Sequence, residues 1–271
     1  MIQGSTELVA IVGSPIAQVK SPENFNRWFA EHQQNTVMLP IDLQHAGLDA
    51  FVQTLRSWHN LRGCVVTVPY KQLLAGRLDR LSERAKALRS VNVIRREADG
   101  ELVGDIVDGE GFLNAARKHG FDPQGKQALV IGTGGVGSAI AYSLCQAGVS
   151  HLLISDLDPE RVETLGNLLR NAFPDTVIGA NPKSLAQFDL VVNATPVGMS
   201  AAEGGPTPLP LSLMDTLAST ALVADVVTSP PITPFLAIAQ RIGCAIQTGP
   251  EMALAQLGNL GHFMGVTPLE I

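Results

Sequence analysis

The sequence contains little cysteine and no excess of positive charge. Its 271 residues include only three cysteines, Cys64, Cys145 and Cys244, which lie far apart and outside any CxxC or Cys/His ligand spacing. We therefore expect structural thiols in a reducing compartment and no metal site. With 19 basic and 25 acidic residues the formal net charge is −6, so nucleic acid and anionic membrane surfaces are not expected partners.

Long apolar runs are also missing from the sequence. No uninterrupted apolar run reaches the roughly 20 residues that a membrane-spanning helix needs. The sequence also does not open with the pattern of a secretory signal peptide, in which a basic segment is followed by an apolar segment and small residues. We therefore expect a cytoplasmic protein. Because 45% of the residues are hydrophobic and 16% are charged, the composition is that of a globular protein, and the length favours two domains.

Strand and helix patterns alternate in residues 1–108. The apolar stretches 7–13, 36–43 and 62–69 predict strands, and two segments whose apolar residues recur at helical spacing lie between them. Two further short strands are joined by a turn at Asp99–Gly100. We predict an N-terminal α/β substrate domain over residues 1–108, onto which the C-terminal helix within 249–271 packs back.

Residues 109–248 have a different pattern. Near-continuous apolar strands are separated by helical segments, in the stretches QALVIG, HLLISD, LVVNAT and LVADVV. Strands of this kind are typical of a parallel sheet that is covered by helices on both faces. The predicted fold class is therefore α/β, with a Rossmann-type doubly wound domain over 109–248 that binds NAD.

A glycine cluster, VIGTGGVGSA, follows the first of these strands and opens an alanine-rich helix. Glycine allows the tight turn and the close approach of the backbone to a pyrophosphate, and the helix N-terminus offers free N–H groups. The alternative is an ordinary turn that needs small residues. The predicted dinucleotide loop comprises Gly132, Thr133, Gly134, Gly135, Val136 and Gly137.

Asp156 ends the next strand, 19 residues after Gly137, and Leu157 follows it. A carboxylate at this place accepts hydrogen bonds from the adenosine ribose and repels a 2′-phosphate. Because Leu157 is not basic, Asp156 and Leu157 predict NAD as the preferred cofactor over NADP. The alternative is that Asp156 only caps a turn.

Seven stretches resemble the shikimate dehydrogenase family in order and spacing, and the resemblance covers nearly the whole chain: GSPIAQVKSPENFN, GCVVTVPYK, SVNVI, GDIVDGEGF, NATPVGM, DVVTSPPITPFL and GPEMALAQ. The resemblance implies an oxidoreductase that interconverts 3-dehydroshikimate and shikimate, or oxidises quinate, with a nicotinamide cofactor. It also implies a role in aromatic amino acid biosynthesis, and an N-terminal substrate domain that faces a Rossmann domain across a cleft.

The family's catalytic lysine and aspartate fall on Lys71 and Asp108. Hydride transfer at an alcohol carbon needs a group that gives or takes the hydroxyl proton, and we expect Lys71 to do so while Asp108 orients it. The alternative for Lys71 is a solvated surface lysine. The resemblance further implies that the substrate binds Ser21, Thr67, Asn92 and Gln256.

The same resemblance places five residues beside the nicotinamide half of the cofactor: Thr195, Pro196, Val226, Gly249 and Met252. Two alternatives remain open at these positions. NATPVGM could simply be a loop after a buried strand, and Met252 could be a core residue of its helix.

The chain departs from the family pattern where the substrate carboxylate and hydroxyls bind. Gln18-Val19 replaces His-Ser, and apolar or smaller residues stand at four further positions, Val65, Ile106, Val107 and Thr228. Loss of two hydrogen bonds to a carboxylate weakens binding roughly 10²- to 10⁴-fold. We therefore expect a substrate whose acid group is placed differently, or a less polar ring alcohol.

Two other functions remain open on the sequence alone. One is quinate dehydrogenase, and the other is a dinucleotide-binding regulator that no longer turns over substrate. The sequence is compatible with a monomer or a homodimer, and it leaves the natural substrate and the direction of the reaction undetermined. We expect hinges near Asp108–Gly109 and Thr248–Gly249.

Overall fold

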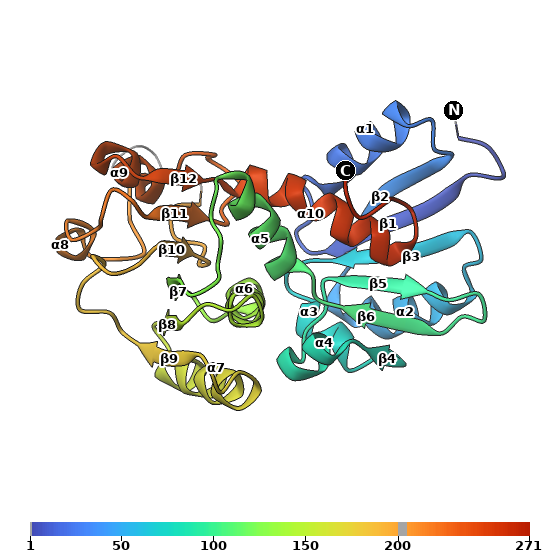
Figure 1. Ribbon diagram of the computed structural model, residues 1–271. Coiled ribbons are helices and arrows are strands. Elements are labelled where there is room, and N and C mark those ends of the chain that lie inside the picture. Colours follow the sequence, from blue (N-terminus) through green and yellow to red (C-terminus); the bar gives the residue numbers. More distant parts are fainter. Residues whose placement is uncertain (1, 200–204) are drawn as a thin grey trace. The chain divides into compact units, whose positions relative to one another are not determined.

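The computed structural model describes residues 2–199 and 205–271, and these residues form two compact units (Figure 1). Unit 1 consists of Met1–Val107 and Gln256–Ile271, and unit 2 consists of Asp108–Ala255. The chain passes from one unit to the other at the start of helix α5, Asp108–Lys118, and within helix α10, Gly249–Met264. No helix in the described ranges is long and apolar enough to cross a membrane.

Unit 1 is built on a six-stranded mixed sheet of order β2-β1-β3-β5-β6-β4. The first three strands pair in parallel, whereas β5 pairs antiparallel with β3 and with β6. The elements are β1 Glu7–Gly13, α1 Ser21–Glu31, β2 Thr36–Asp42, the 3₁₀ turn His45–Gly47, α2 Leu48–Ser57, β3 Leu61–Val66, α3 Lys71–Ala75, β4 Arg80–Leu81, α4 Glu83–Leu88, β5 Val93–Arg96 and β6 Leu102–Asp105.

Unit 2 is built on a parallel six-stranded sheet of order β12-β11-β10-β7-β8-β9. Figure 1 shows α5 and α6 on one face of this sheet and α9 on the other, which is the doubly wound arrangement that the sequence predicts. Its remaining elements are β7 Gln127–Ile131, α6 Gly135–Gln146, β8 His151–Ser155, α7 Pro159–Ala172, β9 Val177–Ala180, β10 Leu190–Asn193, α8 Leu211–Met214, β11 Leu222–Asp225, α9 Pro234–Ile242 and β12 Ala245–Gln247.

Each unit has a hydrophobic core of its own. In unit 1, side chains of β1 and β3 pack with Phe25 and Phe29 of α1 and with Leu257 and Leu260 of α10. In unit 2, one face of the sheet packs with Phe235 of α9 and its neighbours. Successive side chains of a strand point to opposite faces of the sheet. Because helices cover both faces, these strands are apolar along their whole length.

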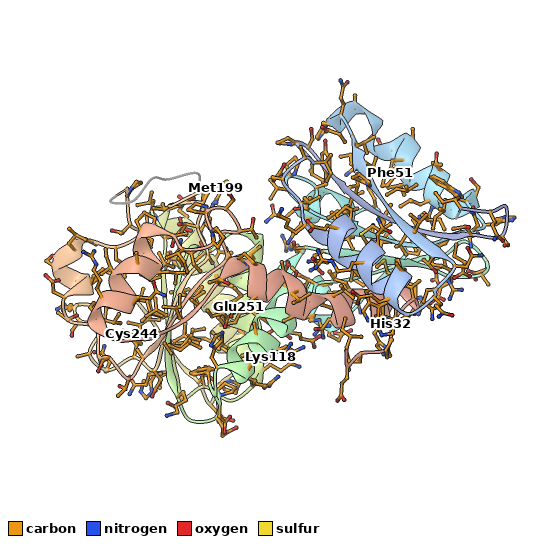
Figure 2. The ribbon with its side chains drawn as sticks, turned by 90° about the horizontal axis from the view of Figure 1, so that it is seen from above. His32, Phe51, Lys118, Met199, Cys244 and Glu251 are labelled. Atoms are coloured by element: carbon orange, nitrogen blue, oxygen red, sulfur yellow. The ribbon has the colours of Figure 1, made fainter. Side chains whose placement is uncertain are left out.

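Side-chain caps fix several helix ends. Asp158 accepts hydrogen bonds from the backbone N–H groups of Glu160 and Arg161 at the start of α7. At the start of α10, the Glu251 carboxylate accepts from the backbone and hydroxyl of Thr248, which is a capping box. Glu251, labelled in Figure 2, also contacts the ring of His119 at 3.2 Å, and this contact joins the beginning of α10 to the end of α5 within unit 2.

Candidate active site

The glycine loop forms the turn between β7 and α6. Gly132 has a φ of +97°, which favours glycine, and its N–H donates to the carbonyl of Ser155 at 2.7 Å. A Cβ on Gly137 would lie 1.9 Å from the carbonyl oxygen of Gly132, so the helix approaches the turn too closely for any side chain there. Gly134 is the N-cap of α6, and a Cβ added to it would have no atom within 4 Å. The helix N-terminus is therefore open to an anion.

Asp156 lies against this loop at the end of β8. Its Oδ2 accepts hydrogen bonds from the N–H of Thr133 at 2.7 Å and the hydroxyl of Thr133 at 2.9 Å, and its Oδ1 accepts from the N–H of Asp158 at 3.0 Å. Partial burial raises the pKa of Asp156, but these hydrogen bonds outweigh it, so the pKa lies below its usual range. Asp156 is therefore an ionised carboxylate that both shapes the loop and caps the turn. The side chain of Leu157 is fully exposed.

The loops that follow β10 and β11 contain further predicted cofactor residues. A Cβ on Gly132 would meet the Thr195 side chain at 2.8 Å, so the glycine loop and the loop with Thr195 and Pro196 are neighbours. A Cβ on Gly249 would meet the carbonyl oxygens of Val227 at 2.2 Å and Val226 at 2.8 Å, which brings the start of α10 against the loop after β11. The structure therefore brings the predicted cofactor residues together at the carboxyl edge of the parallel sheet.

Met252 is 5% exposed in α10, as a core methionine would be. Thr228 is half-buried in the loop after β11.

Three predicted substrate and catalytic residues lie together in unit 1, around the end of β3. Thr67 follows this strand, and Lys71 is the first residue of α3 and is half-buried. The carbonyl of Lys71 accepts the N–H of Val91 at 3.0 Å, next to Asn92. Sequence patterns alone did not identify the five-residue helix α3, because it is too short for a helical repeat to be visible.

Asn92 is buried and accepts hydrogen bonds from the backbone of two other segments of the chain. Its carbonyl accepts the N–H of Val66 at 2.7 Å, and its side-chain Oδ1 accepts the N–H of Val107 at 2.8 Å. The residue before Asp108 is thus fixed by the Asn92 amide. Asp108 itself is buried as the first residue of α5 in unit 2. Ser21 begins α1, and Gln256 belongs to the part of α10 that is assigned to unit 1.

The apolar residues at the departures from the family pattern are packed in the core. Val65, Ile106 and Val107 are at most 5% exposed. Val65 and Val107 belong to the same hydrophobic cluster as Leu257, and Val19 packs against it. The hydrophobic core of unit 1 therefore includes positions at which the sequence analysis expects a departure from the family pattern.

Sequence reasoning missed two networks of buried polar residues. In unit 1, the Asp105 carboxylate pairs with the Arg84 guanidinium at 2.7 and 2.6 Å and accepts the N–H of Ile106. In unit 2, Asn193 and Asp225 are both fully buried and hydrogen-bonded to each other. The available signal was a polar residue at the end of an otherwise apolar strand.

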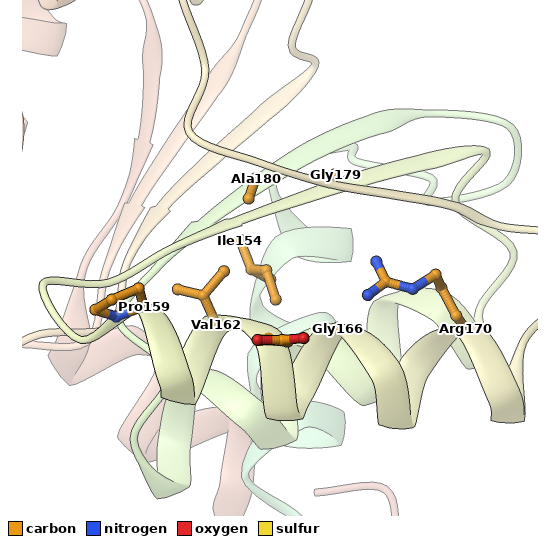
Figure 3. A pocket seen from close by; sticks show the side chains of 8 residues that line it. Ile154, Pro159, Val162, Gly166, Arg170, Gly179 and Ala180 are labelled. Atoms are coloured by element: carbon orange, nitrogen blue, oxygen red, sulfur yellow. The ribbon is translucent and has the colours of Figure 1, made fainter.

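A cavity of about 250 Å³ lies between α7 and the strands β8 and β9 (Figure 3). Its lining is largely apolar, with Ile154, Val162 and Ala180 among its side chains, and Glu163 and Arg170 also line it. It contains none of the residues predicted to bind cofactor or substrate. This cavity is therefore separate from the predicted functional site.

The three cysteines are free and buried, and Cys244 follows α9 (Figure 2). Burial raises the pKa of the Cys145 thiol to about 12 and that of Cys64 further still. Buried thiols whose pKa is raised are poor nucleophiles, which agrees with the structural role that the sequence predicts for them. No cluster of potential metal ligands occurs among the residues for which the structure gives a description.

Comparisons with known proteins agree with this architecture. A model of the shikimate dehydrogenase substrate binding domain matches residues 11–94. A shikimate dehydrogenase (NADP(+)) of Rubrobacter xylanophilus is 37% identical over 262 residues, covering 94% of this chain and 89% of the relative.

Two solved structures are similar over almost the whole chain. Shikimate 5-dehydrogenase of Listeria monocytogenes, in complex with shikimate and NAD, has a TM-score of 0.90 and 31% identity, and covers 99% of this chain and 95% of that one. A ligand-free 5-ketofructose reductase of a Gluconobacter species has a TM-score of 0.87 and 26% identity, and covers 96% and 92%.

Proposed function

Because the chain belongs to the shikimate dehydrogenase family of NAD(P)-dependent oxidoreductases acting on CH–OH groups, we propose that it interconverts a cyclic polyol acid, shikimate or a related ring alcohol, and its 3-keto form, with NAD preferred over NADP. The observation that carries this proposal is the glycine loop of unit 2, with an open helix N-terminus at Gly134 and an ionised carboxylate at Asp156. A dinucleotide bound through this loop would supply the hydride transfer from its nicotinamide ring.

The preference for NAD rests on Asp156. Its two oxygens accept three hydrogen bonds from the protein, which leaves one acceptor position on Oδ1 for a ribose hydroxyl. A 2′-phosphate at that place would bring about two negative charges to a carboxylate. The Rubrobacter relative is named for NADP(+), whereas the Listeria structure holds NAD, so this chain's preference depends on its own residues.

The proton transfer is assigned to Lys71 with Asp108. As an alcohol is oxidised its hydroxyl proton must leave, and an amine within hydrogen-bond reach takes it. Asp108 is assigned the role of orienting the Lys71 amine for this transfer. Ser21, Thr67, Asn92 and Gln256 bind the substrate in unit 1, while unit 2 binds the cofactor through its loops.

The test is a set of initial rates with shikimate and with quinate, each with NAD and with NADP. We compare wild type, Lys71→Ala and Lys86→Ala; the last is a control that removes an exposed lysine of unit 1 paired with Glu83. We expect NAD-dependent turnover that falls about 10²- to 10⁴-fold in Lys71→Ala, because general acid–base catalysis contributes that much. Lys86→Ala should keep wild-type rates.

Three results would contradict parts of this proposal. Equal rates in Lys71→Ala would remove the lysine from the mechanism, and faster turnover with NADP would remove the role of Asp156 in selecting NAD. NAD binding without turnover of any ring alcohol would favour the alternative of a dinucleotide-binding regulator that no longer turns over substrate. Turnover of quinate in preference to shikimate would identify the enzyme as a quinate dehydrogenase.

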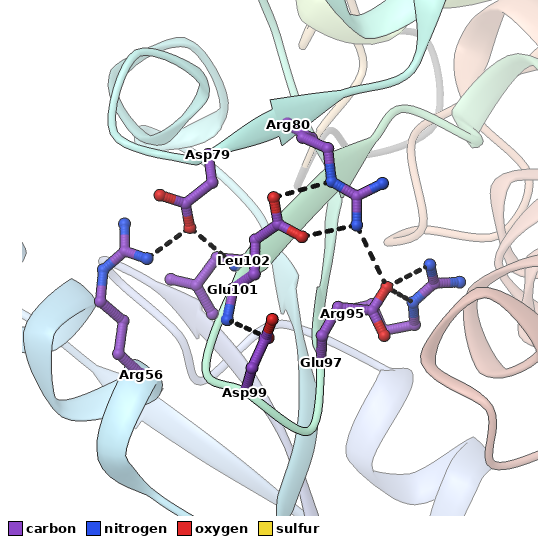
Figure 4. Close-up of polar contacts among 8 residues, drawn as sticks. All are labelled: Arg56, Asp79, Arg80, Arg95, Glu97, Asp99, Glu101 and Leu102. Carbon is purple, nitrogen blue, oxygen red and sulfur yellow. Dashed lines mark hydrogen bonds and ion pairs between the residues drawn. The ribbon is translucent and has the colours of Figure 1, made fainter.

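A second candidate substrate is an uncharged keto polyol. Val65 lies in the core cluster of unit 1 and Val19 packs against it, at positions where the family resemblance implies hydrogen-bond donors for the substrate. Three arginines of unit 1 pair with its own acids: Arg56 with Asp79, Arg80 with Glu101 and Arg95 with Glu97 (Figure 4).

The similar Gluconobacter structure is named a 5-ketofructose reductase, which acts on a compound without a carboxylate. Oxidation of NADH by 5-ketofructose with a higher kcat/KM than by 3-dehydroshikimate would select this candidate, and the reverse order would exclude it.

Two properties of the whole protein belong to the same proposal. The three buried, reduced thiols fit a cytoplasmic enzyme. We propose a monomer or a homodimer, which sedimentation of the purified chain would distinguish.

A further inference from the structure

The strands β10 and β11 end side by side on two fully buried polar residues. Asn193 and Asp225 are partners in the parallel register and are both 0% exposed. The side-chain Nδ2 of Asn193 donates to both carboxylate oxygens of Asp225, at 3.1 Å each. Buried polar groups are retained where they have partners, and each of these residues has several.

The Asn193 amide folds the loop that follows β10. Its Oδ1 accepts the N–H of Thr195 at 3.1 Å and the hydroxyl of Thr195 at 2.7 Å, and its Nδ2 also donates to the carbonyl of Val197 at 3.0 Å. The hydroxyl oxygen of Thr195 in turn accepts the N–H of Val197 at 3.1 Å. The conformation of residues 194–197 therefore depends on the orientation of one amide.

The Asp225 carboxylate fixes the neighbouring loop and the start of α9. Its Oδ1 accepts the N–H of Val227 at 2.9 Å, and its Oδ2 accepts the hydroxyl of Thr233 at 2.7 Å. Thr233 is the N-cap of α9, and its hydroxyl oxygen accepts the N–H of Leu236 at 3.3 Å. One carboxylate thus joins three segments of chain at the edge of the sheet where the glycine loop also lies.

The partners of Asp225 are hydrogen-bond donors. The Nδ2 group of Asn193 and the N–H of Val227 can only donate, so they require acceptor oxygens on Asp225. Burial raises the pKa of the Asp225 carboxyl above its usual range, although the hydrogen bonds from Thr233, Val227 and Asn193 act in the opposite direction. None of the hydrogen-bond partners described for Asp225 is a cation, so only neutral groups hold its position.

We propose that Asp225 is a positioning residue for hydride transfer, which acts through Asn193 and Val227 to hold Thr195, Pro196 and Val226 against the nicotinamide half of the cofactor. This inference rests on the proposed function, because Thr195, Pro196 and Val226 are assigned to the cofactor there. Misplacement of a reacting ring by about 1 Å costs on the order of 10²-fold in rate, so a rigid loop is required.

Two variants test the proposal, with a matched control. Asp225→Asn keeps the shape of the side chain but removes one acceptor oxygen, so at least one of its donors loses its partner. Thr233→Val removes the hydroxyl that donates to Oδ2 of Asp225. This variant replaces Asp225→Asn in the test if Asp225→Asn does not fold. Thr176→Val is the control: Thr176 is also buried in unit 2, and its hydroxyl donates to the Val149 carbonyl at 3.2 Å, but it precedes β9 at the opposite edge of the sheet.

Each protein is titrated with ADP-ribose, which lacks the nicotinamide, and with NADH, whose emission reports the surroundings of the reduced nicotinamide. We expect ADP-ribose to bind all four proteins within about twofold of the same Kd, because it does not reach the loops that Asp225 holds. Bound NADH should emit more like free NADH in Asp225→Asn and Thr233→Val. The kcat should fall at least about tenfold in both, with substrate KM changed less than about threefold.

Wild-type NADH emission and kcat in Asp225→Asn would overturn the proposal. Equal losses in Thr176→Val would overturn it as well, since they would trace the effect to lost stability. Failure of the wild type to bind either nucleotide would instead refute the proposed function, and that result precedes any comparison of variants.

Discussion

At the scale of single residues, the protein stabilises buried carboxylates in two ways. Asp105 receives a bidentate Arg84 guanidinium, whereas Asp225 receives neutral donors only. Removal of one partner from a buried ion pair costs about 3–5 kcal/mol, since the other charge stays buried. Both carboxylates accept a backbone N–H one or two residues later in the chain, so each shapes the loop that follows its own strand.

Asp156 leads to a prediction about acid stability. Its pKa is lower in the folded protein than the usual value of about 3.9, so the folded state favours the ionised form. This stabilisation is present above the unfolded pKa and is lost as the pH falls through the folded pKa. In urea unfolding, Asp156→Asn should therefore lose stability relative to wild type at pH 7, and the difference should shrink at pH 3.

Asp175→Asn is the control for this prediction, because it removes the same charge from an exposed aspartate of unit 2. It should cost less unfolding free energy at pH 7 than Asp156→Asn does. Equal losses in the two variants, or a difference that grows on acidification, would contradict the role assigned to the Asp156 hydrogen bonds.

At the scale of elements, the turn from β7 into α6 uses its glycines for different purposes. Gly132 is required by its positive φ, and Gly137 by the 1.9 Å approach of a Cβ to the Gly132 carbonyl. Gly134 has a φ of −67° and open space, so the folded chain by itself would accept a side chain there. The free space at Gly134 is what a pyrophosphate would use.

The two glycines therefore separate folding from binding. Gly137→Ala should lower the free energy of unfolding by about 1–3 kcal/mol, because the methyl group meets backbone that must move. Gly134→Ala should change it by less than about 0.5 kcal/mol but should weaken NAD binding clearly. Thermal unfolding and NAD titration of both variants check this, and unchanged NAD affinity in a stable Gly134→Ala would show that the pyrophosphate does not approach this residue.

At the scale of the whole molecule, the described residues form a hydrophobic core in each of the two units. The core of unit 1 includes the end of α10, whereas that of unit 2 is made by α9 and one face of the parallel sheet. The predicted cofactor loops lie on β7, β8, β10 and β11 of unit 2. A ligand that binds one cooperative unit stabilises that unit by its binding free energy.

Hydrogen exchange with NAD at 100 times its Kd tests this division. We expect exchange in β7, β8 and β10 to slow by up to about 100-fold, which corresponds to about 2.7 kcal/mol. The strands β1 to β3 of unit 1 should exchange at their former rates. Equal protection in both sheets would show that the two units unfold together.

The sequence by itself determined the local features of this protein. The apolar strands and the turn at Gly132 to Gly137 follow from residues that are close in the chain, and the α/β class and the family followed from their order. The sequence predicts domain boundaries after Asp108 and before Gly249, whereas the two compact units divide before Asp108 and before Gln256. The short helix α3, which begins at Lys71, was not visible because five residues show no repeat.

Only the tertiary structure decided the contacts between distant residues. The pairing of Asn193 with Asp225, 32 residues later, depends on the register of β10 and β11, and local patterns do not encode register. The packing of Val65 and Val107 with Leu257 depends on the return of α10 to unit 1. Burial and hydrogen-bond satisfaction are properties of the assembled fold, and they decide which polar residues hold the loops and where the hydrophobic core ends.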